Sequence, residues 1–563
     1  MAQPNSNAAQ TQDDKASRDA SPETSFLHRL QHINLHDSRW CKLLTVSLAI
    51  SIFIVALVLN LYRSGDPSLW FDEVLSVTRA RQSLAVLLQI ISNTQPNMAL
   101  YYVFLHYWLA FTSLFGLHPT EFVVRFPSAI FAACSAVMIF LLGRRFLGIT
   151  AGILGASLYV LNDLQLVYAQ QTRAYSLQLL LICISWYALF AIITAESHQK
   201  RWWVCFVVAS TLAVYVHLFS LFILFAQVLA LVGLLILPGQ WRTKLRMDIL
   251  SLIVSLLSIA VLILPIILIA NRTGSKTGWL PIPHPADIYR LFLTISANST
   301  IYLLLITLCM LFGLLIAVLV YMPWAKHMFS RLPFGKGIDD TQLQRLLPVV
   351  LPLVLWLVVP VITSYLVSQK SSHLFSSRYL VVIVPALFLL VGLSVAIIPW
   401  RKIQVVLGLG LVLIALHHVP FYYQHAQVED WKSAAHWLQQ KSQVSDGLVC
   451  YDNSQGCQVS IQYYLDAYPA DGDADFDDGS PGSFPWVDYD ITNTLGNYPA
   501  AVDPKALKSY GAKHARLFFI AGRVAAGDVQ LKKARQWLDE HYSFIDQVVT
   551  QTVTIRLYAT TTR

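Results

Sequence analysis

Long apolar runs dominate this sequence and alternate with short polar segments. Spanning a bilayer takes about 20 predominantly apolar residues in a helix. Runs of roughly that length predict eleven membrane spans, at residues 43–62, 123–142, 149–167, 175–195, 202–217, 219–237, 249–270, 301–322, 346–368, 379–398 and 402–419. The pattern therefore predicts a mainly α-helical bundle that crosses the membrane many times.

The two ends of the chain have a different pattern. Residues 1–24 are polar and aperiodic, which predicts a disordered tail. No short apolar core with a cleavage site precedes the 43–62 run, so we expect that run to remain as an anchor. The expected domains are this tail, a transmembrane domain at 25–420 and a small α/β domain at 421–563. In the last of these, DWKSAAHWLQQ and DVQLKKARQWLDEHY predict helices, whereas GLVCYD, RLFFIAG and VVTQTVTIRLYA predict strands.

The segment between the first two runs, residues 63–122, is more than a linker. LWFDEVLSVTRARQSLAVLLQII and MALYYVFLHYWLAFTSLF have the pattern of amphipathic helices and are rich in Trp and Tyr. Such rings favour the boundary between lipid and water. We expect helices that lie along the membrane surface.

Basic residues indicate the orientation in the membrane. They occur before the first run and after the second, fourth, sixth, eighth and tenth: Arg29, Arg39, Lys42, Arg144, Arg145, Lys200, Arg201, Arg242, Lys244, Arg246, Lys326, Arg331, Lys336, Arg401 and Lys402. Cytoplasmic loops carry an excess of Lys and Arg. This alternation predicts a multi-pass protein of the cell (inner) membrane with a cytoplasmic N-terminus. An odd number of spans then places residues 421–563 outside.

Composition agrees with a membrane protein and argues against nucleic acid as a partner. Of 563 residues, 56% are hydrophobic and 13% are charged. The net charge is +8, yet residues 421–563 hold 17 acidic against 12 basic side chains. The remaining bases lie between apolar runs and form no stripe for a phosphate backbone. Cys450 and Cys457 can pair as a disulfide if their domain is outside the cell. No His and Cys cluster predicts a metal site.

Two adjacent carboxylates, Asp72 and Glu73 in SLWFDEVLS, lie at the predicted outer surface. Ionisable groups at a lipid boundary are costly, and their default interpretation is functional. When a sugar is transferred from a polyprenyl phosphate, the leaving group is a phosphate that is stable as an anion. The reaction therefore needs no general acid, and one carboxylate is enough to take the acceptor's proton. Cations then stabilise the departing phosphate. Asp72 fits the role of base, and Arg173 and Arg378, at outer ends of spans, fit the role of phosphate ligands.

A series of motifs carries a family resemblance. SLWFDEVLSV, LYYVFLHYWLAFTSLFG, EFVVRFPSAIFAA, LLGRRFLG, LVYAQQTRAYSL and SSRYLVVIVPALF occur in this order. Together they resemble the GT-C glycosyltransferases of the protein-mannosyltransferase type, which include the aminoarabinose transferases of lipid A, over roughly residues 40–400. The resemblance implies a polyprenyl- or dolichyl-phosphate sugar donor, an extracytoplasmic active site and inversion at the anomeric carbon.

The resemblance also implies roles for single residues. Asp72 matches the acidic position of the first outer loop, the base, and Glu73 its partner. Arg173 with Tyr175 matches an R-x-Y pair, and Arg378 with Tyr379 matches an R-Y pair. Two positions depart from the pattern: Gln171 replaces a Glu of many relatives, and Gln95-Pro-Asn97-Met98 replaces the more usual Pro-Pro-Leu. A second carboxylate near the donor is therefore missing, and the acceptor side differs.

Some residues keep two interpretations. Arg125 either extends to the membrane surface or pairs with the acids of the first loop. His217, His373 and Asp163 either line the active-site cavity or are satisfied polar groups in the bundle. The run DGDADFDDGSPGS at 471–483 lacks the Gly and Glu positions of a calcium loop, so we expect a solvated acidic loop.

We therefore predict an inverting membrane glycosyltransferase that moves a sugar from a polyprenyl-phosphate donor to a lipid, protein or glycan acceptor. The reaction needs no metal ion, and the sequence leaves metal dependence, the sugar and the acceptor open. A transporter or flippase for lipid-linked sugars is the alternative, and it should show inverted repeats and polar sites at mid-membrane. This chain instead gathers its charges at one membrane face. An inactive relative that serves as a scaffold is a third alternative.

Overall fold

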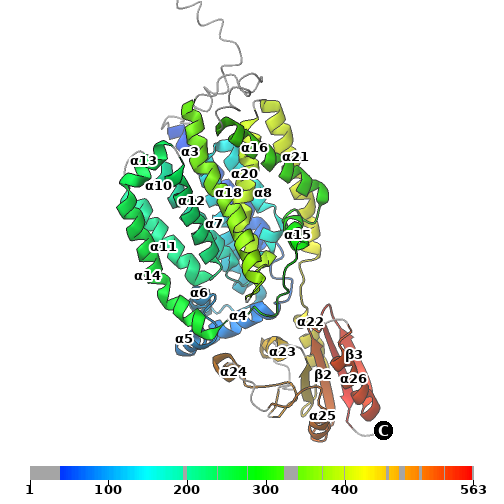
Figure 1. Ribbon diagram of the computed structural model, residues 1–563. Helices are drawn as coiled ribbons and strands as arrows, with labels where there is room; N and C mark the ends of the chain where they lie inside the picture. Colours follow the sequence, from blue (N-terminus) through cyan, green and yellow to red (C-terminus); the bar gives the residue numbers. More distant parts are fainter. Residues whose placement is uncertain are drawn as a thin grey trace, which may run out of the picture.

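The computed structural model describes residues 39–194, 199–237, 239–274, 277–321, 340–370, 372–398, 400–451, 456–467, 476–477, 479–492, 498–524 and 527–560. The tail 1–24, the basic segment 326–336 and residues 471–475 and 478 of the acidic run 471–483 lie outside these residues. Long helices form a bundle, and a small domain built on a sheet lies at one end of it (Figure 1).

Every predicted span coincides with a helix. The bundle consists of α3 (Arg39–Leu61), α7 (Glu121–Phe146), α8 (Ile149–Val160), α9 (Asp163–Ala169), α10 (Tyr175–Thr194), α11 (Lys200–Val216), α12 (Ser220–Ile236), α13 (Gln240–Met247), α14 (Ile249–Thr273), α15 (Pro285–Ile295), α16 (Thr300–Tyr321), α18 (Asp340–Ser368), α19 (Ser377–Leu380), η2 (Val381–Ile383), α20 (Val384–Ile397) and α21 (Arg401–Gln424). Among the described residues, seven helices are long and apolar enough to cross a membrane, and up to ten spans result if each bent pair counts as one. The chain is a multi-pass membrane protein, and the count of eleven stays a prediction.

Bends divide several of these spans. The predicted run 149–167 is two helices, α8 and α9, which meet at 64°. Asn162 causes the break by capping α9, since its side chain accepts a hydrogen bond from the backbone N–H of Gln165. A second bend, of 95°, separates α15 from α16. The break after α8 places the chain that follows it, including Gln171 and Arg173, at one end of the bundle.

Close helix contacts hold the centre of the bundle. Gly143 of α7 lies against Gly152 of α8, where an added Cβ would meet Gly152 Cα at 2.5 Å. Small residues at such contacts let membrane helices approach closely. Farther along, Trp186 of α10 stacks on Trp356 of α18 with ring centroids 5.1 Å apart. Both indoles are fully buried.

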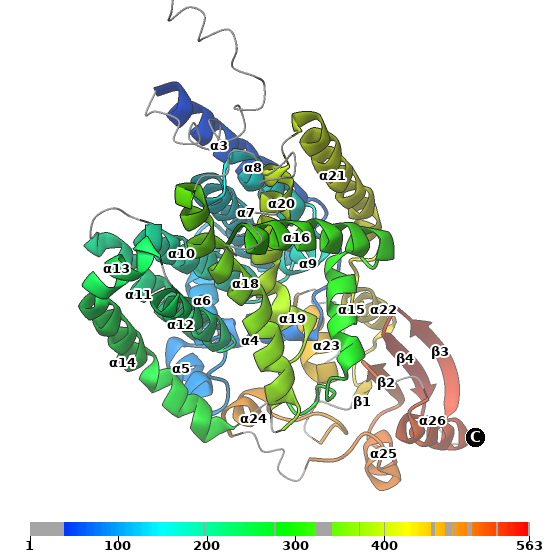
Figure 2. The same cartoon turned by 45° about the horizontal axis from the view of Figure 1, so that its top comes forward.

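Residues 63–122 contain three short helices, α4 (Phe71–Arg81), α5 (Leu84–Asn93) and α6 (Ala99–Ser113). Helices were predicted here in two segments, and the first of these is divided into α4 and α5. They lie across one end of the bundle, between it and the C-terminal domain (Figures 1 and 2). Exposed apolar side chains occur at the end of α6 and just after it, among them Phe111, Leu114 and Phe115. This exposure is consistent with helices at a membrane surface.

The C-terminal domain is the predicted α/β unit. Its helices are α22 (Trp431–Lys441), α23 (Gly456–Ala467), α24 (Trp486–Thr492), α25 (Pro504–Gly511) and α26 (Val529–His541). Its strands are β1 (Gly447–Tyr451), β2 (Arg516–Gly522), β3 (Ser543–Val549) and β4 (Val553–Ala559), in the order β1-β2-β4-β3. Strands β1 and β2 are parallel, and the other neighbours are antiparallel. The predicted strand run 548–559 is thus the end of β3, a turn and β4, because Thr550 to Thr552 reverse the chain.

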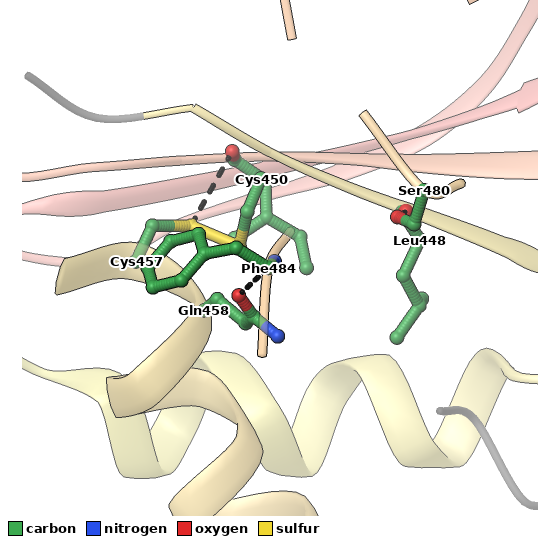
Figure 3. Close-up of a disulfide and its surroundings, with 7 residues drawn as sticks. Leu448, Cys450, Cys457, Gln458, Ser480 and Phe484 are labelled. Carbon is green, nitrogen blue, oxygen red and sulfur yellow. Dashed lines mark hydrogen bonds between the residues drawn. A yellow bond between two sulfur atoms is a disulfide. The ribbon is translucent and has the colours of Figure 1, made fainter. Parts of the chain in front are cut away.

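A disulfide between Cys450 and Cys457 joins β1 to the start of α23. Nearby, the side-chain oxygen of Gln458 accepts a hydrogen bond of 3.0 Å from the backbone N–H of Phe484 (Figure 3). The disulfide that the sequence left open is therefore present. It fixes the direction in which α23 leaves the sheet.

The C-terminal domain and residues 63–122 share one hydrophobic core. Leu69, Val74 and Val77, in and before α4, belong to the same buried cluster as Trp431 and Phe518 of the C-terminal domain. All five side chains are fully buried. Helix α4 therefore packs against the bundle and against the C-terminal domain at the same time.

Candidate active site

The two carboxylates of SLWFDEVLS lie in the first turn of α4. Trp70 is the N-cap residue, and its backbone N–H lies 3.4 Å from an oxygen of Glu73. Acidic side chains are favourable here because the N-terminus of a helix carries partial positive charge. Successive helical residues point in different directions, so Asp72 and Glu73 enter different surroundings.

Asp72 faces two arginines. Its Oδ2 lies 3.2 Å from Nη1 of Arg378 and 3.7 Å from Nη2 of Arg173. Arg173 also donates hydrogen bonds of 3.0 Å to the backbone carbonyl of Asp72 and to Ser76 Oγ. The side chain of Asp72 is 19% exposed. The structure thus brings together the predicted base and both predicted phosphate ligands.

Aromatic rings fix the position of Arg378. Its guanidinium carbon lies 5.6 Å from the ring centroid of Trp70 and 5.1 Å from that of Trp279. Such contacts stabilise a guanidinium and leave the N–H groups in its own plane free to donate hydrogen bonds. Burial alone would lower the pKa of Arg173, but Asp72, Tyr175 and Tyr102 together raise it. Arg173 therefore stays cationic.

Tyr175, Tyr379 and His217 form an aromatic cluster with one another. The ring of His217 lies 5.7 Å from that of Tyr175 and 5.2 Å from that of Tyr379. Its Nδ1 accepts a hydrogen bond from the backbone N–H of Phe219, and Asn97 Oδ1 accepts one from Leu218. His217 thus lies at the break between α11 and α12 and bonds the backbone there, next to Asn97.

Glu73 is fully buried and pairs with Arg125. Nη2 and Nε of Arg125 lie 2.6 and 2.9 Å from the two carboxylate oxygens, and the Thr172 N–H donates to Glu73 at 2.7 Å. Arg125 also donates to the carbonyls of Ser64, Pro67 and Ser68. Of the two interpretations of Arg125, pairing is the one that the structure shows. Glu73 has no exposed surface with which to touch an acceptor.

A cavity of about 230 Å³ lies beside this ion pair. Its lining includes Trp70, Glu73, Arg125, Asp163 and Gln171. It also includes Gln170, Asn298 and His425, so α9, the α15–α16 turn and the residues after α21 all contribute. Among the described residues that line it, Arg125 and Asp163 were predicted cavity residues. His217 and His373 are absent from this lining, and the ring of His373 bonds the carbonyl of Leu280 instead.

Sequence reasoning did not identify the contacts between α4 and the C-terminal domain. Glu429 accepts a hydrogen bond from the backbone N–H of Phe71 at 2.8 Å, and Arg523 pairs with Glu429 at 3.1 Å. Burial raises the pKa of Glu429, although Arg523 opposes the shift. The segment EDWKSAAHWLQQ, which begins with Glu429, was the available signal, but its partner in the first outer loop is 358 residues away.

A second contact lies at the other end of α4. Arg79 donates two hydrogen bonds of 2.6 Å to the carboxylate oxygens of Asp490 on α24. Both side chains are buried. Burial alone would lower the pKa of Arg79, but Asp490 and Tyr102 raise it overall. No sequence pattern linked these two residues, because α24 is a short helix in an irregular region.

Solved structures show the same architecture. The apo crystal structure of ArnT from Cupriavidus metallidurans matches with a TM-score of 0.54 and 12% sequence identity, over 92% of this chain and 97% of that one. The structure of the same protein bound to undecaprenyl phosphate matches with a TM-score of 0.51 and 11% identity, over 93% and 98% of the two chains. The chain has the GT-C fold.

The sequence itself matches one family in part. Residues 102–269 match the family described as dolichyl-phosphate-mannose-protein mannosyltransferase. This segment of the GT-C fold contains Arg125, Arg173 and Tyr175, whereas Asp72 and Arg378 lie outside it. No curated protein sequence is significantly similar to the chain.

Proposed function

We propose that this protein is a glycosyltransferase that moves one sugar from a polyprenyl-phosphate carrier to an acceptor at the outer face of the membrane. The observation that carries the proposal is the contact of one carboxylate, Asp72, with two arginines, Arg173 and Arg378. The GT-C fold supports the proposal, since ArnT, which has a similar fold, was solved with undecaprenyl phosphate.

The cluster of Asp72, Arg173 and Arg378 has an excess of positive charge, which favours binding of an anion. Asp72 contributes one negative charge, and Arg173 and Arg378 contribute two positive charges, mostly shielded from solvent. Unbalanced charge in a poorly solvated site is unfavourable. A phosphate group bound by both guanidinium groups would balance it, and Arg is well suited to phosphate because its donors match the oxygens of the anion.

Binding of that phosphate also prepares the base. In the structure both arginines approach the same oxygen of Asp72. A phosphate that takes over these donors leaves the carboxylate to accept the proton of an acceptor hydroxyl. The acceptor oxygen forms a bond to the anomeric carbon while the bond to the phosphate oxygen breaks. The phosphate leaves as an anion held by the arginines. Attack opposite to the leaving group inverts the anomeric carbon.

The cavity beside Trp70 is the place that we propose for the sugar. At about 230 Å³ it is smaller than typical pockets for drug-sized ligands, which suits a monosaccharide and not a lipid tail. Trp70 joins the cavity to the arginines, because it lines the cavity and stacks on Arg378. Asp163 and Gln171 would meet sugar hydroxyl groups there.

The same proposal includes the orientation and the domains. Asp72, the C-terminal domain at 421–563 and the proposed sugar cavity face the outside of the cell (inner) membrane, and residues 25–420 form the catalytic transmembrane domain. The alternation of basic segments supports this orientation. The acceptor is a lipid, a protein or a glycan on the outer face.

Deletion of the gene, followed by mass spectrometry of envelope lipids, glycans and glycoproteins, tests the proposal. We expect one sugar to disappear and to return when the wild-type gene is restored. The variant Asp72→Asn should fail to restore it. Asp66→Asn is the matched control, because Asp66 is an exposed acid in the same loop that pairs with Arg63. Full restoration by Asp72→Asn would refute its role as the base. Accumulation of the sugar-linked carrier on the cytoplasmic face of the deletion strain would instead indicate a flippase.

A further inference from the structure

The first turn of α4 is held by the C-terminal domain. Oε2 of Glu429 accepts hydrogen bonds from the backbone N–H of Phe71 at 2.8 Å and from the indole N–H of Trp431 at 2.7 Å. Its Oε1 lies 3.1 Å from Nε of Arg523. Glu429 is buried, so these partners replace water around the carboxylate. Phe71 directly precedes Asp72, so Glu429 bonds the peptide next to the proposed base.

Arg523 holds the same turn through the side chain of Phe71. Its guanidinium carbon lies 4.2 Å from the centroid of the Phe71 ring. Gly456, at the start of α23, leaves the room for this contact. A Cβ on Gly456 would lie 2.6 Å from the Phe71 ring and 2.6 Å from Arg523 Nη1. The disulfide at the neighbouring Cys457 fixes this end of α23.

Helix α23 also holds the residues before the turn. The hydroxyl oxygen of Tyr464 accepts a hydrogen bond of 2.6 Å from the backbone N–H of Leu69, and Ser68 Oγ donates to the same oxygen at 3.1 Å. Tyr464 in turn donates to Glu121 at 3.2 Å. The C-terminal domain therefore bonds the backbone at Leu69 and at Phe71, on both sides of the N-cap residue Trp70.

We propose that Glu429 and Arg523 are positioning residues, through which the C-terminal domain sets the place of Asp72 relative to Arg173 and Arg378. This inference rests on the proposed function. Asp72 itself is in contact with the bundle, whereas the turn that carries it is bonded to the domain. A catalytic group displaced by about 1 Å can lose about 100-fold in rate, so the position of this turn matters for turnover.

Glu429 acts on the helix in two ways. Its negative charge lies at the N-terminus of α4, where it is favourable next to the helix dipole. One of its oxygens also satisfies a backbone N–H that has no partner within the helix. A neutral amide in its place loses the charge and turns an N–H₂ group toward either Arg523 or the Phe71 N–H. The first turn of α4 should then loosen.

The variant Glu429→Gln tests this directly in the full-length protein. Hydrogen exchange of a peptide that covers residues 68–76 should become faster, since Glu429 bonds the Phe71 amide. Binding of undecaprenyl phosphate, measured by native mass spectrometry, should stay within about twofold of wild type, because both arginines remain. The rate at which membranes restore the missing sugar should fall about 10- to 100-fold.

Asp446→Asn is the matched control. Asp446 is also a buried carboxylate of the C-terminal domain, but its partners Arg516 and Gln443 belong to that domain. We expect it to change neither exchange at residues 68–76 nor the transfer rate. A conservative rescue adds a second test. Arg523→Lys keeps the charge beside Glu429 and should be several-fold more active than Arg523→Ala.

The outcomes separate the two proposals. If Asp72→Asn is inactive and Glu429→Gln transfers sugar at the wild-type rate, the positioning role is wrong and the proposed function stands. If Asp72→Asn keeps the wild-type rate, the proposed base is wrong, whatever Glu429 does. Equal losses in Glu429→Gln and Asp446→Asn would mean that the domain is merely destabilised, which also overturns the positioning role.

Discussion

Two ion clusters begin at neighbouring residues and differ in almost every physical respect. The Asp72 cluster has one carboxylate for two arginines, contacts of 3.2 and 3.7 Å, and partial exposure. The Glu73 cluster has one carboxylate for one arginine, contacts of 2.6 and 2.9 Å, and no exposed carboxylate surface. The first cluster has an excess of positive charge, and in the second cluster the charges are balanced.

The difference distinguishes an ion pair that stabilises the fold from a cluster that is suited to binding a substrate. A closed, fully bonded pair is expensive to break but has no donor to offer a substrate. A loose, electropositive pair contributes little to stability and can exchange its partner for a phosphate. We therefore propose different roles for these two adjacent carboxylates, chemistry for Asp72 and stability for Glu73, and the difference follows from their burial.

Loss of Arg125 should have the largest effect. Arg125→Met leaves Glu73 buried without a cation and breaks the bonds to three carbonyls, which should cost about 3–5 kcal/mol of stability. We expect a large fall in the yield of folded protein in detergent and a lower melting temperature. If Arg125→Met unfolded at the wild-type temperature, the Glu73 cluster would not be important for stability.

Asp72→Asn should separate activity from folding. Removal of a general base lowers rates by about 10²–10⁴-fold. Thermal unfolding should stay near that of wild type, because the contacts of Asp72 are long and partly exposed. Glu73→Gln is the contrasting variant, and it should lower stability. If both variants lower stability equally, the contrast between the clusters fails.

Arg378→Lys should have an intermediate effect. Lysine keeps the positive charge but loses the planar group that stacks between Trp70 and Trp279. We expect binding of undecaprenyl phosphate to weaken about tenfold, or about 1.4 kcal/mol, as measured by native mass spectrometry. Arg290→Lys is a control, because Arg290 is exposed and pairs with Asp287. Unchanged binding in Arg378→Lys would assign the phosphate elsewhere.

Asp66→Asn should have the smallest effect. Its partner Arg63 is about half exposed, and exposed pairs contribute about 0–1 kcal/mol. Melting temperature and transfer rate should both match wild type within error. A clear loss of transfer would mean that acids across the whole first loop, and not Asp72 alone, support the reaction.

The sequence predicted the fold well because membrane physics leaves few choices. Apolar length located a helix in every predicted run, although it missed the short helices α13 and α15, and the residue pattern located β1, β2 and β4 of the C-terminal domain. Charge at an apolar surface and leaving-group chemistry selected Asp72, Arg173 and Arg378, which the structure then brings together. These three residues could be selected from the sequence because each is a charged side chain next to an apolar run.

The remaining features depend on distant partners. The sequence does not show how Glu73 and Asp72 differ. The difference arises from Arg125, which pairs with Glu73 in the buried interior. Glu429 and Asp490 resemble ordinary surface acids of a soluble domain, but both bond the α4 region. Nothing local in a sequence reports a contact across several hundred residues. The break at Asn162 was missed for a different reason. The length of an apolar run does not reveal that a residue inside it, here Asn162, caps a second helix.

The contact between Glu429 and Phe71 also has a consequence for the timing of synthesis. The two residues are 358 positions apart. At translation rates of about 5–20 residues per second, the partner of α4 emerges between about 20 and 70 s after α4 itself. Until the C-terminal domain has been made, the first turn of α4 lacks its hydrogen bond to Glu429. If Asp72 acts as the base that we propose, a chain that stalls before Glu429 would lack the contacts that position Asp72, and activity would begin only after the C-terminal domain is complete.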